Sequence, residues 1–155
     1  MYEKEIKEIG LFFFLALLDE KKAKNLGTRA VSLFLKRMKK NPQAATHVEM
    51  VFVTKTIWKK SHSSATRGRP QFSPDSGWLI PANLDVSPWM EFQKSAPEDE
   101  FLILIWSQIL QITNHDLSMA LGITEGTIRY RLGRAFRRLG GMQRPLDKKI
   151  ELVKT

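Results

Sequence analysis

The chain has 155 residues, 43% of them hydrophobic, a formal net charge of +9 and no cysteine. Without cysteine it has no disulfide framework and no thiolate metal site. Its three histidines, His47, His62 and His115, are too scattered along the chain to predict a zinc cluster or another metal site. The hydrophobic content suits one ordinary domain or two small helical ones, and we favour two.

The apolar run at residues 11–18 is the one segment that raises the question of a membrane. It is far shorter than the roughly 20 residues that span a bilayer. The sequence DEKKAK follows it in place of a small-residue cleavage site. We therefore expect a buried helix in a cytoplasmic protein with no membrane partner, and secretion is the remote alternative.

Residues 1–62 are predicted to form a three-helix bundle. Apolar residues recur at helical spacing in two stretches, and a break is expected at Asn41-Pro42. The expected core residues of the two stretches are Ile6, Ile9, Phe13, Phe14 and Leu17, then Leu26, Ala30, Val31, Leu33, Phe34 and Leu35. A third helix from about 43 to 60 would bury Val48, Val51, Phe52 and Ile57. The β-branching at 51–57 leaves a strand possible, but we prefer a helix.

Residues 63–86 are rich in serine, glycine and proline, which is typical of a linker. Its apolar residues Trp78, Leu79 and Ile80 are expected to dock on a domain or a partner. The segment 87–112 supplies two further helices, and residues 142–155 form a basic tail. The predicted architecture is therefore all-α: an N-terminal three-helix bundle (1–62), a linker (63–86) and a C-terminal four-helix domain (87–141) that contains a helix-turn-helix.

The helix-turn-helix is predicted for residues 113–141, TNHDLSMALGITEGTIRYRLGRAFRRLGG. Thr113 with Asp116 is typical of a helix start, and Gly122 provides the positive φ that ends a short helix. Thr124 is the expected N-cap of a second helix that runs to about Leu139. The second helix has an apolar inner face at Ile128, Leu132, Ala135 and Leu139. The pair Gly140-Gly141 is expected to stop it.

The second helix is rich in arginine on its outer side. A short capped helix, a glycine turn and a basic partner helix are typical of proteins in which the second helix enters the major groove of DNA. The alternative is an ordinary solvated helix face. The candidate DNA contacts are Thr124, Gly126, Thr127, Arg129, Tyr130, Arg131, Arg134, Arg137 and Arg138, with Arg137 and Arg138 expected at phosphates.

The segment DLSMALGITEGTIRYRLGRAFRRL resembles the promoter-reading domain of bacterial sigma factors, especially the small two-domain extracytoplasmic-function group. That family's pattern is approximately E-I-A-x-x-L-G-I-S-x-G-T-V-x-x-R-L-x-R-A-x-x-x-L. Residues 121–124 match L-G-I-S, 126–128 match G-T-V, and 131–135 match R-L-x-R-A. The acids of 98–100 follow Pro97, as in the family, but Phe101 replaces its usual arginine. The resemblance implies promoter DNA, core RNA polymerase and an inhibitory anti-sigma protein as partners. Response-regulator output domains share a similar helix-turn-helix.

The resemblance is weaker over the N-terminal half. The family's polymerase-binding helix reads A-E-D-L-x-Q-E-x-F, and only Ala23 and Leu26 match it here, with basic or neutral residues in place of the acids. The segment FVTKTIWKK resembles the family's segment that faces opened DNA. Aromatic rings beside lysines can stack bases and hold a single strand, so the resemblance implies single-strand contacts at Phe52, Lys55, Trp58 and Lys59. The alternative places Phe52 in the core and Trp58 on the surface.

Charge is distributed in blocks, with balances of −1 for residues 1–18, +10 for 19–70, −5 for 71–112 and +5 for 113–155. Two DNA-contacting modules joined by an acidic connector would produce this pattern, although chance also makes short charge blocks. We expect a sigma-factor-like initiation protein, with a stand-alone regulator that does not join polymerase as the alternative. A DNA-processing enzyme would need a catalytic constellation, which is not recognisable here. No enzyme activity and no cofactor are therefore expected.

Overall fold

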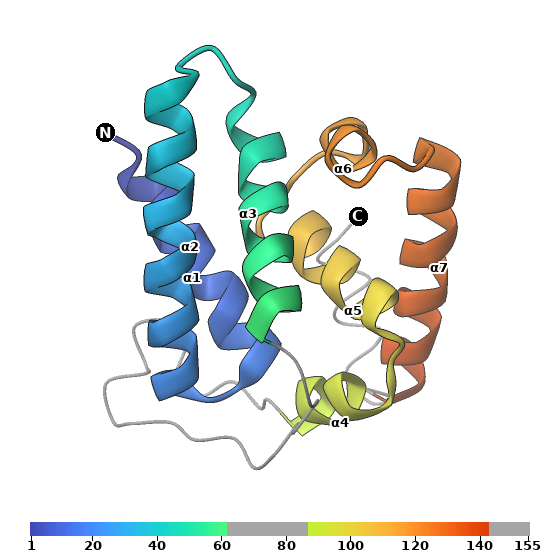
Figure 1. The fold of residues 1–155 in the computed structure, drawn as a ribbon. Helices are drawn as coiled ribbons and strands as arrows, with labels where there is room; N and C mark the ends of the chain where they lie inside the picture. The colour runs from blue at the N-terminus through green and yellow to red at the C-terminus, as the bar shows by residue number, and fades with distance from the viewer. Residues whose placement is uncertain (62–86, 143–155) are drawn as a thin grey trace.

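The structure, a computed structural model, describes residues 1–61 and 87–142. All elements in these two ranges are helices, so the predicted all-α class is confirmed and the alternative of a strand at 51–57 is wrong. The helices are α1 (Glu3–Leu17), α2 (Glu20–Lys40), α3 (Thr46–Ser61), α4 (Ser87–Ser95), α5 (Glu98–Leu104), α6 (Asn114–Leu121) and α7 (Glu125–Met142) (Figure 1). A π-helical segment, η2 (Ile105–Ile109), continues α5. The predicted linker and all but the first residue of the predicted tail lie outside the described residues.

Local signals set the ends of the first helices. Leu18, with φ of 53°, ends α1, and its N–H donates to the carbonyl of Phe14. The side chain of Asp19 then accepts a hydrogen bond of 3.1 Å from the backbone N–H of Lys22, which caps α2. As the sequence predicts, α2 ends just before Asn41-Pro42. The turn at Leu18-Asp19 lets α1 and α2 fold back on each other. The turn at Asn41-Pro42 then brings α3 back to pack against both.

The N-terminal and C-terminal helices bury their apolar residues in one hydrophobic cluster. Phe12 of α1 stacks on Trp106 of η2, with ring centroids 5.5 Å apart. The indole of Trp106 donates a hydrogen bond of 3.0 Å to the hydroxyl of Thr54 in α3. Farther along α3, contacts extend to α6. The two predicted helical units therefore do not have separate cores in this structure.

Helix α4 covers the end of α1 (Figure 1). The indole N–H of Trp89 donates to the carbonyl of Leu15 at 2.9 Å, and the side-chain amide of Gln93 donates to the carbonyl of Ala16 at 2.7 Å. The last carbonyls of a helix have no partner within the helix itself. Side chains of α4 therefore complete the C-terminal end of α1.

In the parts of the chain that are described, no helix combines the length and the apolar character needed to cross a bilayer.

Candidate nucleic-acid interface

Helices α6 and α7 are joined by a tight turn whose capping groups agree with the sequence. The hydroxyl of Thr113 accepts from the N–H of Asp116 at 3.1 Å, and that of Thr124 accepts from the N–H of Thr127 at 3.1 Å. Gly122 has φ of 68°, a conformation that costs glycine little because it has no Cβ. A further bond, which the sequence did not indicate, runs from the hydroxyl of Ser118 to the carbonyl of Ile123 at 2.6 Å. The bond of Ser118 and the cap of Thr124 therefore fix the turn, whereas Thr113 fixes the start of α6.

The inner face of α7 packs against α4, α5 and α6. Ile128, Leu132 and Ala135 are buried, and Leu139 packs at the edge of the core. The predicted stop at Gly140-Gly141 is wrong, because α7 continues to Met142. Glycine in a helix costs only about 1 kcal/mol relative to alanine, so two glycines next to a well-packed face are not sufficient to end it.

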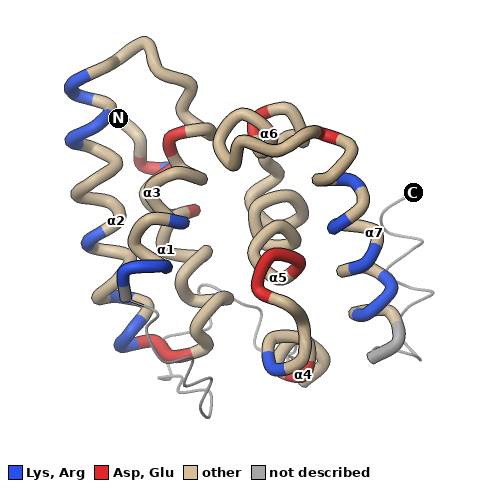
Figure 2. Tube along the Cα trace, turned by 45° about the vertical axis from the view of Figure 1, so that its right-hand side comes forward, with Lys and Arg blue, Asp and Glu red and all other residues tan. Residues whose placement is uncertain are grey.

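The candidate DNA contacts lie mostly on the solvent side of α7. Six of them are exposed, namely Thr124, Gly126, Arg129, Tyr130, Arg134 and Arg137, whereas Thr127, Arg131 and Arg138 are half-buried. Tyr130 is 61% exposed, which is high for an aromatic side chain. The basic residues of α7 and the acidic residues at the start of α5 lie near one another (Figure 2).

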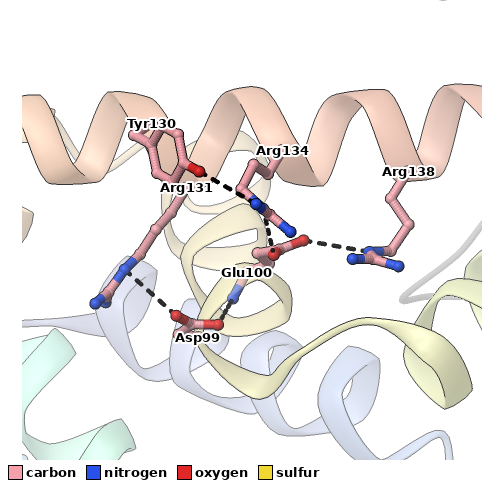
Figure 3. Close-up of polar contacts among 6 residues, drawn as sticks. All are labelled: Asp99, Glu100, Tyr130, Arg131, Arg134 and Arg138. Atoms are coloured by element: carbon pink, nitrogen blue, oxygen red, sulfur yellow. Dashed lines mark hydrogen bonds and ion pairs between the residues drawn. The ribbon is translucent and has the colours of Figure 1, made fainter.

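Three of these arginines form ion pairs with the first turn of α5 (Figure 3). The carboxylate of Glu100 receives the Nε groups of Arg134 and Arg138, each at 3.2 Å, and its side chain is only 4% exposed. Arg131 lies 3.4 Å from Asp99. We call Asp99, Glu100, Arg131, Arg134 and Arg138 the α5–α7 ion-pair cluster. The sequence showed the acids but gave no signal of their pairing, because partners 34 and 38 residues apart share no local pattern.

Arg134 is further held by its neighbour on the helix. Its guanidinium donates to the hydroxyl of Tyr130 at 3.1 Å. The hydrogen bonds with Tyr130 and with Glu100 raise the pKa of Arg134 above its ordinary value, so the side chain is charged at any physiological pH. Arg134 therefore keeps a full positive charge while its direction is fixed by two partners.

The remaining arginines of α7 are differently placed. Arg129 and Arg137 are exposed, and neither forms an ion pair with another residue of the described ranges. A shallow hollow of about 430 Å³ is lined by Arg134, Arg137 and Arg138. The outer side of α7 thus offers two unpaired cations and a basic hollow to an anionic ligand.

The four residues expected at single-stranded DNA do not form one platform. Trp58 is 1% exposed and its indole donates a hydrogen bond to Glu98, so the prediction of a base-stacking Trp58 is wrong for this structure. Phe52 is 39% exposed, but the guanidinium of Arg37 covers its ring at 4.1 Å from the centroid. Lys55 is half-buried and Lys59 is exposed. Phe52 and Trp58 lie about a third of a turn apart around α3, on different sides of the helix.

The described residues contain no group of three or more histidine, aspartate or glutamate side chains placed to hold a metal ion. In comparisons with known proteins, no family model matches the chain, and no curated protein shows significant similarity to it.

Proposed function

We propose that this chain reads duplex DNA through α6 and α7 and acts in transcription initiation in the manner of a sigma factor. The observation that carries the proposal is the pair of capped helices joined at Gly122, with α7 held by its apolar face and its basic side exposed. Helices arranged in this way present the second helix to the major groove.

The two ends of α7 would have different tasks. In such motifs the N-terminal residues of the second helix meet base edges, which assigns that role to Gly126, Thr127, Arg129 and Tyr130, beside the cap Thr124. Arg137 would meet a phosphate, because phosphate contacts position a protein on DNA without reading sequence. Arg131, Arg134 and Arg138 would support α7 through Asp99 and Glu100, and Arg134 and Arg138 would also contact the DNA backbone from the hollow that they line.

The sigma-like role adds core RNA polymerase and an inhibitory anti-sigma protein as partners. It is supported by the density of matches between residues 116 and 139 and the family's pattern. The second candidate is a regulator that binds DNA without joining polymerase. Two observations favour it: α2, which contains the segment that weakly resembles the family's polymerase-binding helix, is basic along its exposed side, and Trp58 is buried.

Binding selections followed by affinity measurements test the DNA-reading role. We expect Arg129→Ala to weaken binding to the selected sequence by about 1–3 kcal/mol and to relax selectivity at one base position, as the loss of a guanine contact does. Arg137→Ala should weaken binding to all sequences alike and reduce the salt slope by about 1. Lys94→Ala, an exposed cation of α4, is the matched control. Equal behaviour of all three variants would overturn the proposal.

Run-off transcription with purified core RNA polymerase separates the two candidates. Transcripts that start at defined sites on genomic promoter fragments, and only when the protein is added, would establish initiation. Sequence-selective DNA binding without such transcripts, and without capture of core polymerase, would establish the regulator.

A further inference from the structure

Helix α2 carries a long basic surface that the proposed DNA-reading site does not use. We call it the α2 basic face; it consists of Lys21, Lys22, Arg29, Lys36, Lys39 and Lys40, all exposed. The buried side of the helix, which includes Leu26, Ala30 and Phe34, packs against α1 and α3. The α2 basic face is therefore turned away from the other described helices, as the outer edge of α2 in Figure 2 shows.

Lys24 and Arg37, the other two cations of α2, form ion pairs with acids of α2 and α3. Lys24 lies 3.4 Å from Glu20, and Arg37 lies 3.0 Å from Glu49. The only acidic residue of α2 is Glu20, so no acid interrupts the α2 basic face. None of its five lysines forms an ion pair within residues 1–61 and 87–142. The five lysines of the α2 basic face are therefore not neutralised by ion pairs in the part of the chain that the structure describes.

Part of this arrangement works against the stability of the isolated helix, although Lys39 and Lys40 stand in the last turn, where the helix dipole favours cations. Lys21 and Lys22 stand in the first turn, where the helix dipole disfavours cations. Lys36 and Lys40 are four residues apart, a spacing at which like charges repel. Solvated helix faces usually mix charges of both signs. A bound polyanion would offset the repulsion among these lysines, because each of them would be attracted to its negative charges.

The dimensions and chemistry of the α2 basic face fit a duplex backbone. From Lys22 to Lys40 the helix rises about 27 Å, which matches roughly eight base pairs at 3.4 Å each. Exposed Asn25, Thr28 and Ser32 lie among the cations, and such polar side chains commonly contact phosphate and sugar. A helix that lies on a membrane would need several large apolar side chains to insert. On α2 only Leu35, at 37%, is an exposed large hydrophobic residue.

We infer that the α2 basic face binds the backbone of a second DNA duplex, so that one molecule joins two DNA segments. Helices α2 and α7 lie at opposite edges of the molecule in both views (Figures 1 and 2). Each presents its basic side away from the shared core, so one straight duplex cannot lie along both. Joining two duplexes rests on the proposed function of α7, whereas backbone binding by α2 does not.

A bridging assay with the full-length protein tests the inference. A 30-base-pair duplex is fixed on beads, protein is bound and washed, and a fluorescent duplex of the same sequence is added. The wild type should retain the second duplex. A variant with K22Q, R29Q, K36Q and K40Q should remain on the beads but retain at least tenfold less. The control, with K4Q, K7Q, K60Q and K94Q, loses the same charge from other exposed positions and should behave like the wild type. Circular dichroism and the melting temperature check that each variant is folded.

Four outcomes would overturn the inference. The α2 variant could bridge as well as the wild type, as it would if a protein dimer joined duplexes through two α7 helices. The control could lose as much bridging as the α2 variant. The α2 variant could retain DNA bridging but lose binding to phosphatidylglycerol vesicles, which would assign the face to a membrane. Finally, the salt dependence of DNA binding could be unchanged in both variants. Each phosphate contact that is lost should lower the slope of this dependence by about 0.9.

A third variant keeps the two proposals distinguishable. R129Q with R137Q removes the unpaired cations of α7 and leaves α2 intact. If it abolishes selective binding and bridging, both proposals stand. If it changes neither, while the α2 variant loses most of its salt-dependent affinity, the proposed function fails and backbone binding by α2 remains.

Discussion

Glu100 is the residue on which the position of α7 most directly depends. A carboxylate that is almost fully buried is stable only when its lone pairs are satisfied, and here two arginines of α7 satisfy them. Asp99 stands next to it but is half exposed, and water screens its contact with Arg131. Two adjacent acids of one helix therefore contribute very differently to stability.

Replacing each acid by its amide tests this difference. We expect Glu100→Gln to lower the free energy of unfolding by about 1–3 kcal/mol, because it removes the negative charge and leaves one of the two guanidinium groups without its acceptor. Asp99→Asn should change it by less than about 1 kcal/mol. Urea denaturation measures both, and an equal loss in the two variants would contradict this account of the α5–α7 ion-pair cluster.

Glu8 of α1 gives a pH-dependent prediction. Its Oε1 atom is buried without a hydrogen-bond partner among the described residues, and burial raises the pKa of this carboxyl, although Lys4 and His47 act in the opposite direction. The folded state therefore favours the protonated form. The stability that comes from this proton is complete below the unfolded pKa and is lost as the pH rises through the raised folded pKa.

We expect Glu8→Gln to be more stable than the wild type at pH 7, because the amide removes the negative charge that burial disfavours. The difference should shrink toward zero below about pH 4, where the unfolded carboxyl is also protonated. Urea midpoints between pH 3.5 and 8 measure it. A difference that does not vary with pH would show that Glu8 stays charged without cost.

The sequence predicted the roles of single residues correctly where they depend on local signals. It failed where a side chain is buried by several neighbouring helices. The caps at Thr113 and Thr124 depend on atoms three residues away and were predicted correctly. Phe52 and Trp58 were expected either both at a base or with Phe52 in the core and Trp58 on the surface, whereas the structure exposes Phe52 and buries Trp58. Helix α3 packs against α1, α2 and α6, so its apolar residues follow no single stripe.

At the scale of elements, the two N-caps of the helix-turn-helix form a matched pair. Thr113 caps α6 away from the proposed DNA surface, and Thr124 caps α7 within it. Replacing either threonine by alanine should cost about 1 kcal/mol of stability. Only Thr124→Ala should also weaken DNA binding, measured by fluorescence anisotropy at a temperature where both variants are folded. A similar loss of affinity in Thr113→Ala would mean that the loss reflects stability alone.

The residues at which helices end were harder to predict from the sequence than the presence of the helices. Both helices of the motif were placed correctly, but α7 passes through the glycines expected to stop it. The π-helical segment η2 was not predicted at all. Its defining bond, from the N–H of Leu110 to the carbonyl of Ile105 at 3.0 Å, has no sequence signature of the kind that caps have. It contains Trp106, whose contacts with Phe12 and Thr54 lie outside any local sequence window.

At the scale of the whole molecule, the described helices share one hydrophobic core, whereas we favoured two small domains from the composition. The proline-rich segment marks a linker in the sequence, but it carries no information on whether the helices before and after it pack together. That depends on side-chain shapes that meet only in three dimensions, such as the stack of Phe12 on Trp106. Periodicity identifies which face is apolar and leaves its partner undetermined.

A shared core predicts one cooperative unfolding transition. Calorimetry should give a single peak with equal calorimetric and van't Hoff enthalpies. Trp106→Ala should lower the free energy of unfolding by about 3–5 kcal/mol, as the loss of a large core aromatic does, and far-ultraviolet and near-ultraviolet signals should still change together. Two separate peaks, with only one of them shifted by Trp106→Ala, would show that the halves fold independently.

The bonds from Trp89 and Gln93 to the end of α1 have a consequence for synthesis on the ribosome. The donors lie 74 and 77 residues after their acceptors, so at about 5–20 residues per second the first helix is exposed for several seconds before they are made. Until then its last carbonyls can bond only to water. A nascent chain that stops before α4 therefore lacks the groups that complete the C-terminal end of α1, and this end becomes stable only after α4 has been translated.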